Sequence, residues 1–365
     1  MMIPGTYFAA LLLTVISMLC WGSWANTIKL SGKWRFELFY FDYTFGVLAC
    51  AVIAAFTFGS IESVPADMPG VAFSFVDNMS ISGKTQMAWA AAGGVIFNIA
   101  NLLLVAAISV AGLSVAFPVG IGVALITGVI LNYIIKPAGN PALLFGGVAV
   151  VLLAIVVTAL AHAAHAAGKT ATEPAVAQTV AGARAVHRPG ARRSAAPSPL
   201  KGISLSLAAG LLMGLFYPLV EMSKKGDLGL GPYAAAFCFA VGILLSTPVF
   251  NLFFMNLPVE GDPVSFRHYF LGTRKQHLLG IAGGMIWCLG TISNFVAASA
   301  PPSVHLGPAI SYAIGQGATL VSTLWGLLVW KEFAGATPAV RGRLALMLIL
   351  YVAGLAMLSL APLYN

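Results

Sequence analysis

The sequence predicts an all-α polytopic membrane protein whose ten transmembrane helices form two inverted five-helix repeats. Three observations predict this fold class: the composition, the number of long apolar segments and the distribution of basic residues. Of the 365 residues, 59% are hydrophobic and only 8% are charged, and the mean hydropathy is +0.92. This composition excludes a water-soluble globular protein of the same length.

The apolar segments have the length of a bilayer-spanning helix, which is about 20 residues for a hydrocarbon core of about 30 Å. None alternates polar and apolar side chains as the strands of a β-barrel do. The first segment is expected to be retained, because Met1–Tyr7 contain no Lys or Arg and no small-residue cleavage site follows. We place the ten helices at residues 8–28, 38–58, 88–110, 115–135, 142–162, 203–220, 233–255, 278–298, 310–330 and 344–360.

Basic residues are concentrated in the alternate loops on one side of the predicted bundle. The connections after the first, third, fifth, seventh and ninth helices contain 15 of the 19 Lys and Arg residues. Because basic loops stay in the cytoplasm, both termini are expected outside and the connector between helices five and six in the cytoplasm. The short loops, without a cleavable targeting segment, favour a bacterial inner membrane or another plasma membrane.

The long connector divides the chain into halves of similar length. Residues 163–201 are rich in Ala, Pro, Arg and Ser and show no hydrophobic period, so we expect a disordered cytoplasmic linker. Residues 1–162 and 202–365 each contain five predicted helices. The second half therefore enters the membrane from the opposite face, which makes the two halves inverted repeats.

A weak internal similarity supports the duplication. Ala92–Phe97 in helix three resembles Ala282–Trp287 in helix eight, and Gly120–Gly122 in helix four resembles Gly315–Gly317 in helix nine. Glycines that only allow close helix packing are the alternative explanation. Inverted repeats are typical of transporters, in which two similar halves expose a central site to either side in turn.

Nucleotides and cofactors are not expected. Gly168, Lys169 and Thr170 match only a relaxed phosphate-loop pattern, and a transmembrane helix precedes them in place of a strand. An Ala-rich helix end with a lysine reaching the membrane surface is the favoured interpretation. The net charge of +8 reflects the basic loops on one side of the membrane, so no nucleic-acid partner is expected. The four Cys residues lack metal-ligand spacing, so no metal site is expected either.

Polar and aromatic side chains inside the apolar helices are the candidates for solute binding, because burying them in a membrane is costly unless they are used. Asn98 and Asn101 share one helix face, as do Trp287, Thr291 and Asn294. A hydrogen bond between helices is the alternative role for any one of them. The predicted substrate-binding residues are Trp21, Trp24, Asn26, Asn98, Asn101, Tyr217, Asn294, Tyr312 and Gln316.

These side chains are suited to a flat, neutral solute. Amides pair with ring carbonyl and N–H groups, while Trp and Tyr cover the two faces of a ring. The middles of the helices contain no Arg or Lys that could bind a phosphate or carboxylate. The solute is therefore expected to be a heterocycle or a sugar.

Coupling to protons requires an ionisable group near the pathway. Asp42 and Glu221 are the two candidate carboxylates, near the inner end of helix two and the outer end of helix six. A structural ion pair is the alternative for each, with Lys29 or Arg35 for Asp42 and with Lys224 or Lys225 for Glu221. Without a protonatable carboxylate the protein would be a facilitator.

The residues also resemble a known family. Cys20–Trp24, Phe39–Tyr43, Ala54–Gly59, Phe117–Gly122 and Gly139–Ala149 are similar to the first, second, fourth and fifth helices of the ureide permeases. The resemblance implies a ten-helix member of the drug/metabolite transporter superfamily with a central cavity. Plant members move allantoin, uracil and related oxo-heterocycles with protons. The family's phosphate-loop-like motif survives here only as Gly168-Lys169-Thr170.

The predicted function is proton-coupled, secondary-active transport of a small neutral polar solute, such as allantoin, uracil or a related purine or pyrimidine derivative. A glucose- or rhamnose-type sugar permease of the same superfamily is the alternative. A membrane-embedded transferase would need a cluster of Asp, Glu or His at a membrane face, and the sequence shows none. A receptor would bind its ligand without moving it.

Overall fold

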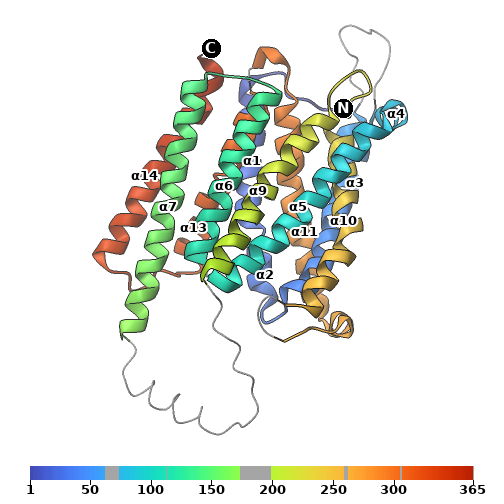
Figure 1. Cartoon of the computed structure of the whole chain (residues 1–365). Coiled ribbons are helices and arrows are strands. Elements are labelled where there is room, and N and C mark those ends of the chain that lie inside the picture. Colours follow the sequence, from blue (N-terminus) through green and yellow to red (C-terminus); the bar gives the residue numbers. More distant parts are fainter. Residues whose placement is uncertain (62–73, 112, 173–198, 259–261, 305, 365) are drawn as a thin grey trace.

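The protein is an all-helical bundle in a computed structural model that describes residues 1–61, 74–111, 113–172, 199–258, 262–304 and 306–364. Within these residues ten helices are long and apolar enough to cross a membrane. The helices run side by side along one axis (Figure 1). The predicted fold class and number of spans are therefore confirmed.

Eight of the spans are single helices, and the first and ninth are each divided. The helices are α1 (Tyr7–Ser23) followed by α2 (Asn26–Ser31), α3 (Phe36–Phe56), α5 (Lys84–Ala111), α6 (Leu113–Ile135), α7 (Pro141–Thr172), α9 (Pro199–Ser223), α10 (Pro232–Asn256), α11 (Arg274–Ala298), α12 (Pro308–Gly315) followed by α13 (Ala318–Leu324), and α14 (Pro338–Leu360). Two short elements in the connections, α4 (Phe75–Ile81) and the 3-10 helix η2 (Phe266–Leu271), were not expected from the sequence.

Both chain termini lie at one end of the bundle, which we call the terminal end (Figure 1). Helix α7 stops and helix α9 begins at the opposite end, which we call the connector end. Helix α7 continues ten residues beyond its predicted end at His162, to Thr172. Helix α9 begins at Pro199, so residues 163–172 and 199–201 of the predicted disordered linker are helical, and residues 173–198 lie outside the described residues.

The continuous helices predicted at 8–28 and 310–330 are wrong in one respect, because the first is interrupted at Trp24 and Ala25 and the ninth at Gln316 and Gly317. In the first, the side chains of Asn26 and Thr27 donate to the Ser23 and Trp24 carbonyls, 2.8 and 2.7 Å away. Such bonds compete with the helical pattern of the backbone. In the ninth, α12 ends at Gly315, and α13 runs into a π-helical turn over Trp325–Val329.

Close helix contacts at glycines relate the two halves of the chain. A Cβ atom at Gly94 in α5 would overlap the Phe239 carbonyl of α10, and one at Gly284 in α11 would overlap the Tyr43 carbonyl of α3. Helices α5 and α10 are the third and seventh spans, whereas α11 and α3 are the eighth and second. Exchange of the halves maps the third span onto the eighth and the seventh onto the second, so the two contacts are equivalent. This equivalence extends the predicted similarity of Ala92–Phe97 and Ala282–Trp287 to three dimensions.

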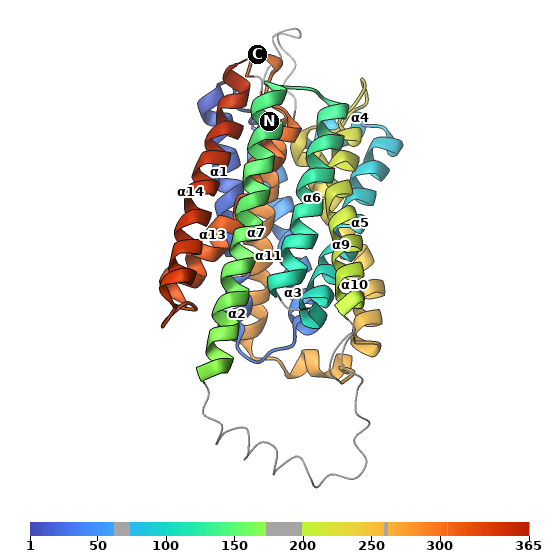
Figure 2. The same ribbon diagram turned by 60° about the vertical axis from the view of Figure 1, so that its left-hand side comes forward.

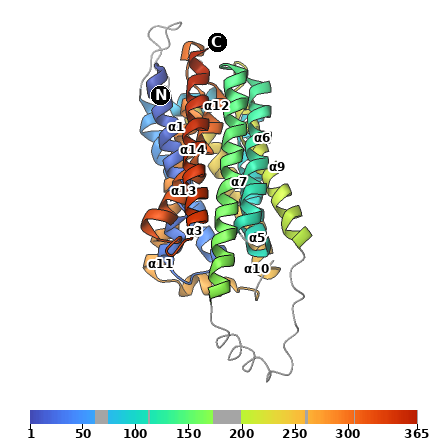
Figure 3. The ribbon, with the colours of Figure 1, turned by 90° about the vertical axis from the view of Figure 1, so that its left-hand side faces the viewer.

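The first and sixth spans show the same relation. Gly22 in α1 packs against the carbonyl of Ala318 in α13, whereas Gly210 in α9 packs against the carbonyl of Gly120 in α6. The spans therefore form two groups. The first bundle contains α1–α3 and α11–α13, and the second bundle contains α5, α6, α9 and α10. Helices α7 and α14 pack on each other at one side of the molecule (Figures 2 and 3).

The glycine contacts make a stability prediction. Replacing Gly284 with Val should lower the melting temperature of the detergent-purified protein by several degrees, because overpacking a close contact costs about 1–3 kcal/mol. Gly342→Val is the matched control, since Gly342 is also helical but has nothing within 4 Å of its Cβ position. Equal melting temperatures for the two variants would contradict the packing described here.

Candidate functional site

A central cavity of about 450 Å³ lies between the first and second bundles. It extends from Trp287 and Phe216, near the middle of the bundle, to Ile28, Phe36 and Ile108 close to the connector end. Its volume is in the range of small-molecule sites, about 300–1,000 Å³. The lining residues are Trp21, Gly22, Trp24, Ala25, Ile28, Phe36, Phe97, Asn101, Leu104, Val105, Ile108, Ile121, Met213, Phe216, Trp287, Gln316, Ala318, Thr319 and Ser322.

Stacked aromatic rings form the deep wall of the cavity. Trp21 and Trp287 are stacked with ring centroids 6.4 Å apart and an interplanar angle of 16°. Trp287 also stacks on Phe97 at 4.3 Å. The indole N–H of Trp21 donates to Thr291 Oγ1 at 3.1 Å, which fixes the orientation of that ring. Flat, rigid surfaces of this kind bind planar groups at a low cost in conformational entropy.

The polar groups of the cavity are neutral. Asn101 donates from Nδ2 to the hydroxyl of Tyr40 at 3.2 Å, and this bond fixes the amide at the cavity wall. Gln316 lies where the ninth span is interrupted, and its side-chain amide has no hydrogen-bond partner among the described residues. No Asp, Glu, Lys or Arg is among the residues that line this cavity. The site can therefore hold a neutral hydrogen-bonding solute, and it offers a full charge no counter-ion.

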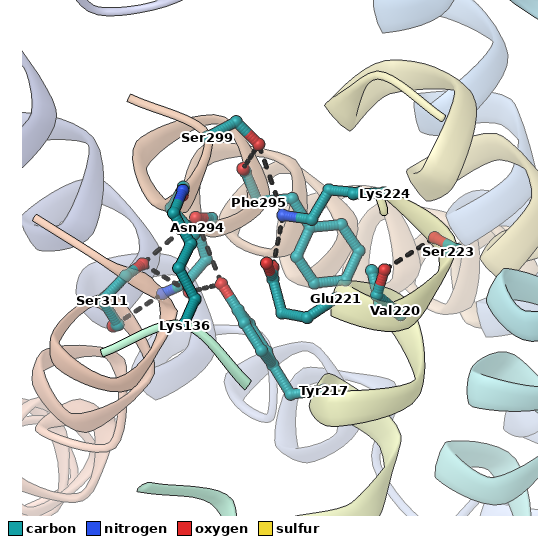
Figure 4. Close-up of polar contacts among 11 residues, drawn as sticks. Lys136, Tyr217, Val220, Glu221, Ser223, Lys224, Asn294, Phe295, Ser299 and Ser311 are labelled. Atoms are coloured by element: carbon teal, nitrogen blue, oxygen red, sulfur yellow. Dashed lines mark hydrogen bonds and ion pairs between the residues drawn. The ribbon is translucent and has the colours of Figure 1, made fainter. Parts of the chain in front are cut away.

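Towards the terminal end the two bundles are joined by hydrogen bonds instead of being separated by a cavity (Figure 4). The hydroxyl of Tyr217 in α9 donates to Asn294 Oδ1 in α11 at 2.7 Å. Asn294 Nδ2 donates to Ser17 Oγ and to the Ser311 carbonyl, both at 3.0 Å. Tyr312 donates to the carbonyl of Met213 at 3.3 Å. All of these contacts are buried, so the cavity is closed on this side.

A charged cluster lies between that network and the terminal end of the bundle. Glu221 forms an ion pair with Lys224, and Lys224 also donates to Ser299 Oγ at 3.3 Å (Figure 4). Lys136, just beyond the end of α6, donates to the Ala298 carbonyl at 3.4 Å. Burial lowers the pKa of Lys136, and Glu221 partly offsets this effect. The alternative predicted for Glu221, an ion pair with Lys224, is thus present.

Asp42 is buried near the connector end and lies outside the cavity wall. Its carboxylate accepts from Tyr269 at 2.7 Å and contacts His277 Nδ1 at 2.8 Å. Burial and the bond to Asp42 raise the pKa of Tyr269. The alternative partners predicted for Asp42 are wrong, because Lys29 pairs with Glu332 and Arg35 with Glu37. Tyr269 of η2 and His277 of the first turn of α11 are the observed partners instead.

The structure separates the predicted substrate-binding residues into three groups. Trp21, Trp24, Asn101 and Gln316 line the central cavity. Asn26 lines a neighbouring cavity instead and accepts from the indole N–H of Trp330 at 2.6 Å. The last group, Asn98, Tyr217, Asn294 and Tyr312, is fully buried in hydrogen bonds between helices and does not line the central cavity.

Several cavity residues were not among the predicted ones. Phe97, Met213 and Phe216 are apolar, and nothing in the sequence distinguishes them from side chains that face lipid. Trp287 shares a helix face with Thr291 and Asn294, and that pattern could have identified it. The segment Gly168-Lys169-Thr170 is helical, so it lacks the strand-to-helix loop that a phosphate cradle requires.

Comparison with known proteins agrees with this architecture. The ureide permease family model matches residues 39–187 and 185–361, which correspond to the two repeats. Ureide permease 2 of Arabidopsis thaliana is 25% identical over 97% of this chain and 96% of its own length. Ureide permease 5 of the same plant is 26% identical over 96% and 93%. A crystal structure of a protein with 17% identity has the same fold, with a TM-score of 0.55 over 98% of this chain and 99% of that one.

Proposed function

Because this chain belongs to the ureide permease family and is therefore a multi-pass membrane transporter, we propose that its solute is a small neutral oxo-heterocycle such as allantoin or uracil. The central cavity carries this proposal. Its wall combines the stacked rings of Trp21, Trp287 and Phe97 with the amides of Asn101 and Gln316, and it contains no charged side chain. Stacking on the faces of a planar ring and amide pairing along its edge fit this arrangement.

Uptake into proteoliposomes tests the solute. Radiolabelled allantoin or uracil should enter, and an excess of the unlabelled compound should compete with it, whereas glucose and rhamnose should not. Uptake of glucose or rhamnose without uptake of either heterocycle would replace this proposal with a sugar permease. Binding without uptake would indicate a receptor.

The same assay tests the aromatic wall. Trp287→Ala should raise KM about tenfold, which corresponds to about 1.4 kcal/mol of lost binding. Trp89→Ala is the matched control, because it removes the same kind of side chain from a transmembrane helix. Trp89 lies in α5, as Phe97 does, but it is 39% exposed and does not line the cavity. Trp89→Ala should retain the melting temperature of the original protein, whereas Trp287→Ala should lower it, because Trp287 is buried and stacks on Phe97. KM does not depend on the amount of folded protein, so the two variants can still be compared.

We also propose that solute movement is coupled to protons through Asp42 and Glu221, the two predicted carboxylates buried within spans. The bundles are joined by hydrogen bonds at the terminal end and separated by the cavity towards the connector end, and an alternating-access transporter would exchange these two arrangements. Protonation of Glu221 would weaken its pair with Lys224, and protonation of Asp42 would weaken its contact with His277. Both changes act on contacts that hold helix ends together.

Neutral variants test this coupling. Asp42→Asn and Glu221→Gln should each abolish accumulation driven by an inward proton gradient, while exchange of labelled for unlabelled solute continues. Glu37→Gln is the control, since Glu37 pairs with Arg35 at the surface of the connector end. Proton-driven accumulation that is unchanged in Asp42→Asn would remove Asp42 from the mechanism.

For orientation, we propose that the terminal end faces outside and the connector end faces the cytoplasm of a bacterial or other plasma membrane. The excess of Lys and Arg in the connector-end loops supports this orientation. A membrane-impermeant maleimide should label Ser80→Cys on intact cells and Arg267→Cys only after permeabilisation. The unmodified protein is the control, because its four cysteines are buried or half-buried. The reverse labelling pattern would invert the topology.

A further inference from the structure

A second, smaller cavity of about 210 Å³ lies beside the central one, towards the connector end. It is bounded by the first, fourth, fifth, ninth and tenth spans and shares Gly22, Ala25, Thr319 and Ser322 with the wall of the central cavity. Unlike the central cavity it contains charged side chains, namely Lys29 and Glu332, and also His162. We call it the side cavity.

Lys29 and Glu332 form an ion pair that joins the end of the first span to the end of the ninth. The Glu332 carboxylate lies against Gly326, whose missing side chain provides the space: a Cβ there would be 2.8 Å from Oε2. The Glu332 amide donates to the Gly326 carbonyl at 2.9 Å, beside the π-helical turn. Irregular turns of this kind occur frequently at functional sites.

Hydroxyl groups extend from the ion pair towards the central cavity. Thr319, which lines both cavities, hydrogen-bonds to Tyr351, and Tyr351 contacts Thr158. His162 lies one helical turn after Thr158 on α7, on the side of the charged pair. These groups can each donate and accept a proton, so together they provide a polar route that the solute does not need to occupy.

The side-cavity pair is the repeat-related counterpart of the charged cluster at the terminal end. Glu221 and Lys136 lie at the ends of the sixth and fourth spans, beyond the contact of Gly210 with Gly120. Lys29 and Glu332 lie at the ends of the first and ninth spans, beyond the equivalent contact of Gly22 with Ala318. Exchange of the halves therefore places Lys29 at the position of Glu221 and Glu332 at the position of Lys136. Each end carries one acidic and one basic residue, with the two charges exchanged between the spans.

We propose that Glu332 is the group that exchanges the coupled proton with the solution at the connector end, as Glu221 does at the terminal end. The inference rests on the proton coupling proposed above. A proton carried on the Glu332 carboxyl is released to that solution, and the carboxylate then re-forms its pair with the Lys29 ammonium, which is the state observed. Within the part of the chain that the structure describes, the other titratable and charged groups around Glu332 include His162 and His165 from α7, Tyr351 from α14 and the adjacent Lys331.

Transport by Glu332→Gln in proteoliposomes tests the proposal, with radiolabelled allantoin or uracil as the probe. Under an inward proton gradient the unmodified protein should concentrate the solute inside, whereas Glu332→Gln should stop when the two sides are equal. Exchange of labelled for unlabelled solute should continue in the variant, because exchange needs no net proton movement. Glu332→Asp should restore part of the accumulation, and Glu37→Gln should behave as the unmodified protein does.

The possible failures are distinguishable. Accumulation by Glu332→Gln equal to that of the unmodified protein would overturn this inference and leave the coupling intact. Loss of exchange together with accumulation, in a variant whose melting temperature is unchanged, would overturn it in favour of a structural ion pair. Failure of the unmodified protein to concentrate any solute under a proton gradient would overturn the coupling and this inference together.

Discussion

The close approach of helix backbones at a few glycines is the constraint on which the rest of the structure depends. In a hydrocarbon environment apolar side chains gain little by leaving lipid for protein, so helices associate where small residues let their backbones meet. Gly94 joins α5 to α10, and Gly284 joins α11 to α3. In the same way Gly22 joins the first span to the ninth, and Gly210 joins the sixth span to the fourth. These contacts define two bundles, and the central cavity is the space left between them.

The two ends of that interface differ in their polar contacts. At the terminal end Tyr217, Asn294 and Ser311 satisfy one another in a buried network, which supplies the partners that membrane-embedded polar groups require. Towards the connector end the cavity is lined by the apolar side chains of Ile28, Phe36 and Ile108. The two bundles are therefore joined by hydrogen bonds on the terminal side and separated by the cavity on the connector side. The aromatic wall of Trp21 and Trp287 lies at the boundary between the two.

Charge is confined to places outside the central cavity. Glu221 lies between the buried network and the terminal end, Asp42 lies on α3 against Tyr269 and His277, and Glu332 lies in the side cavity. Under the proposed function, a neutral chamber with ionisable groups around it would separate solute recognition from proton binding. In such an arrangement the two are linked through the helices that they share, and no direct contact between solute and proton is required.

Much of the architecture is determined by the sequence alone. The number of spans, their class and the equal halves follow from the length and hydrophobicity of each segment, which are local properties that no neighbouring helix alters. The role of each polar residue was decided only by the tertiary structure. Asn98 and Asn101 share a helix face, yet Asn98 is buried against α10 while Asn101 reaches the cavity. Likewise Phe97 and Phe216 became cavity residues only because the second bundle, which combines helices from both halves of the chain, faces the first bundle there.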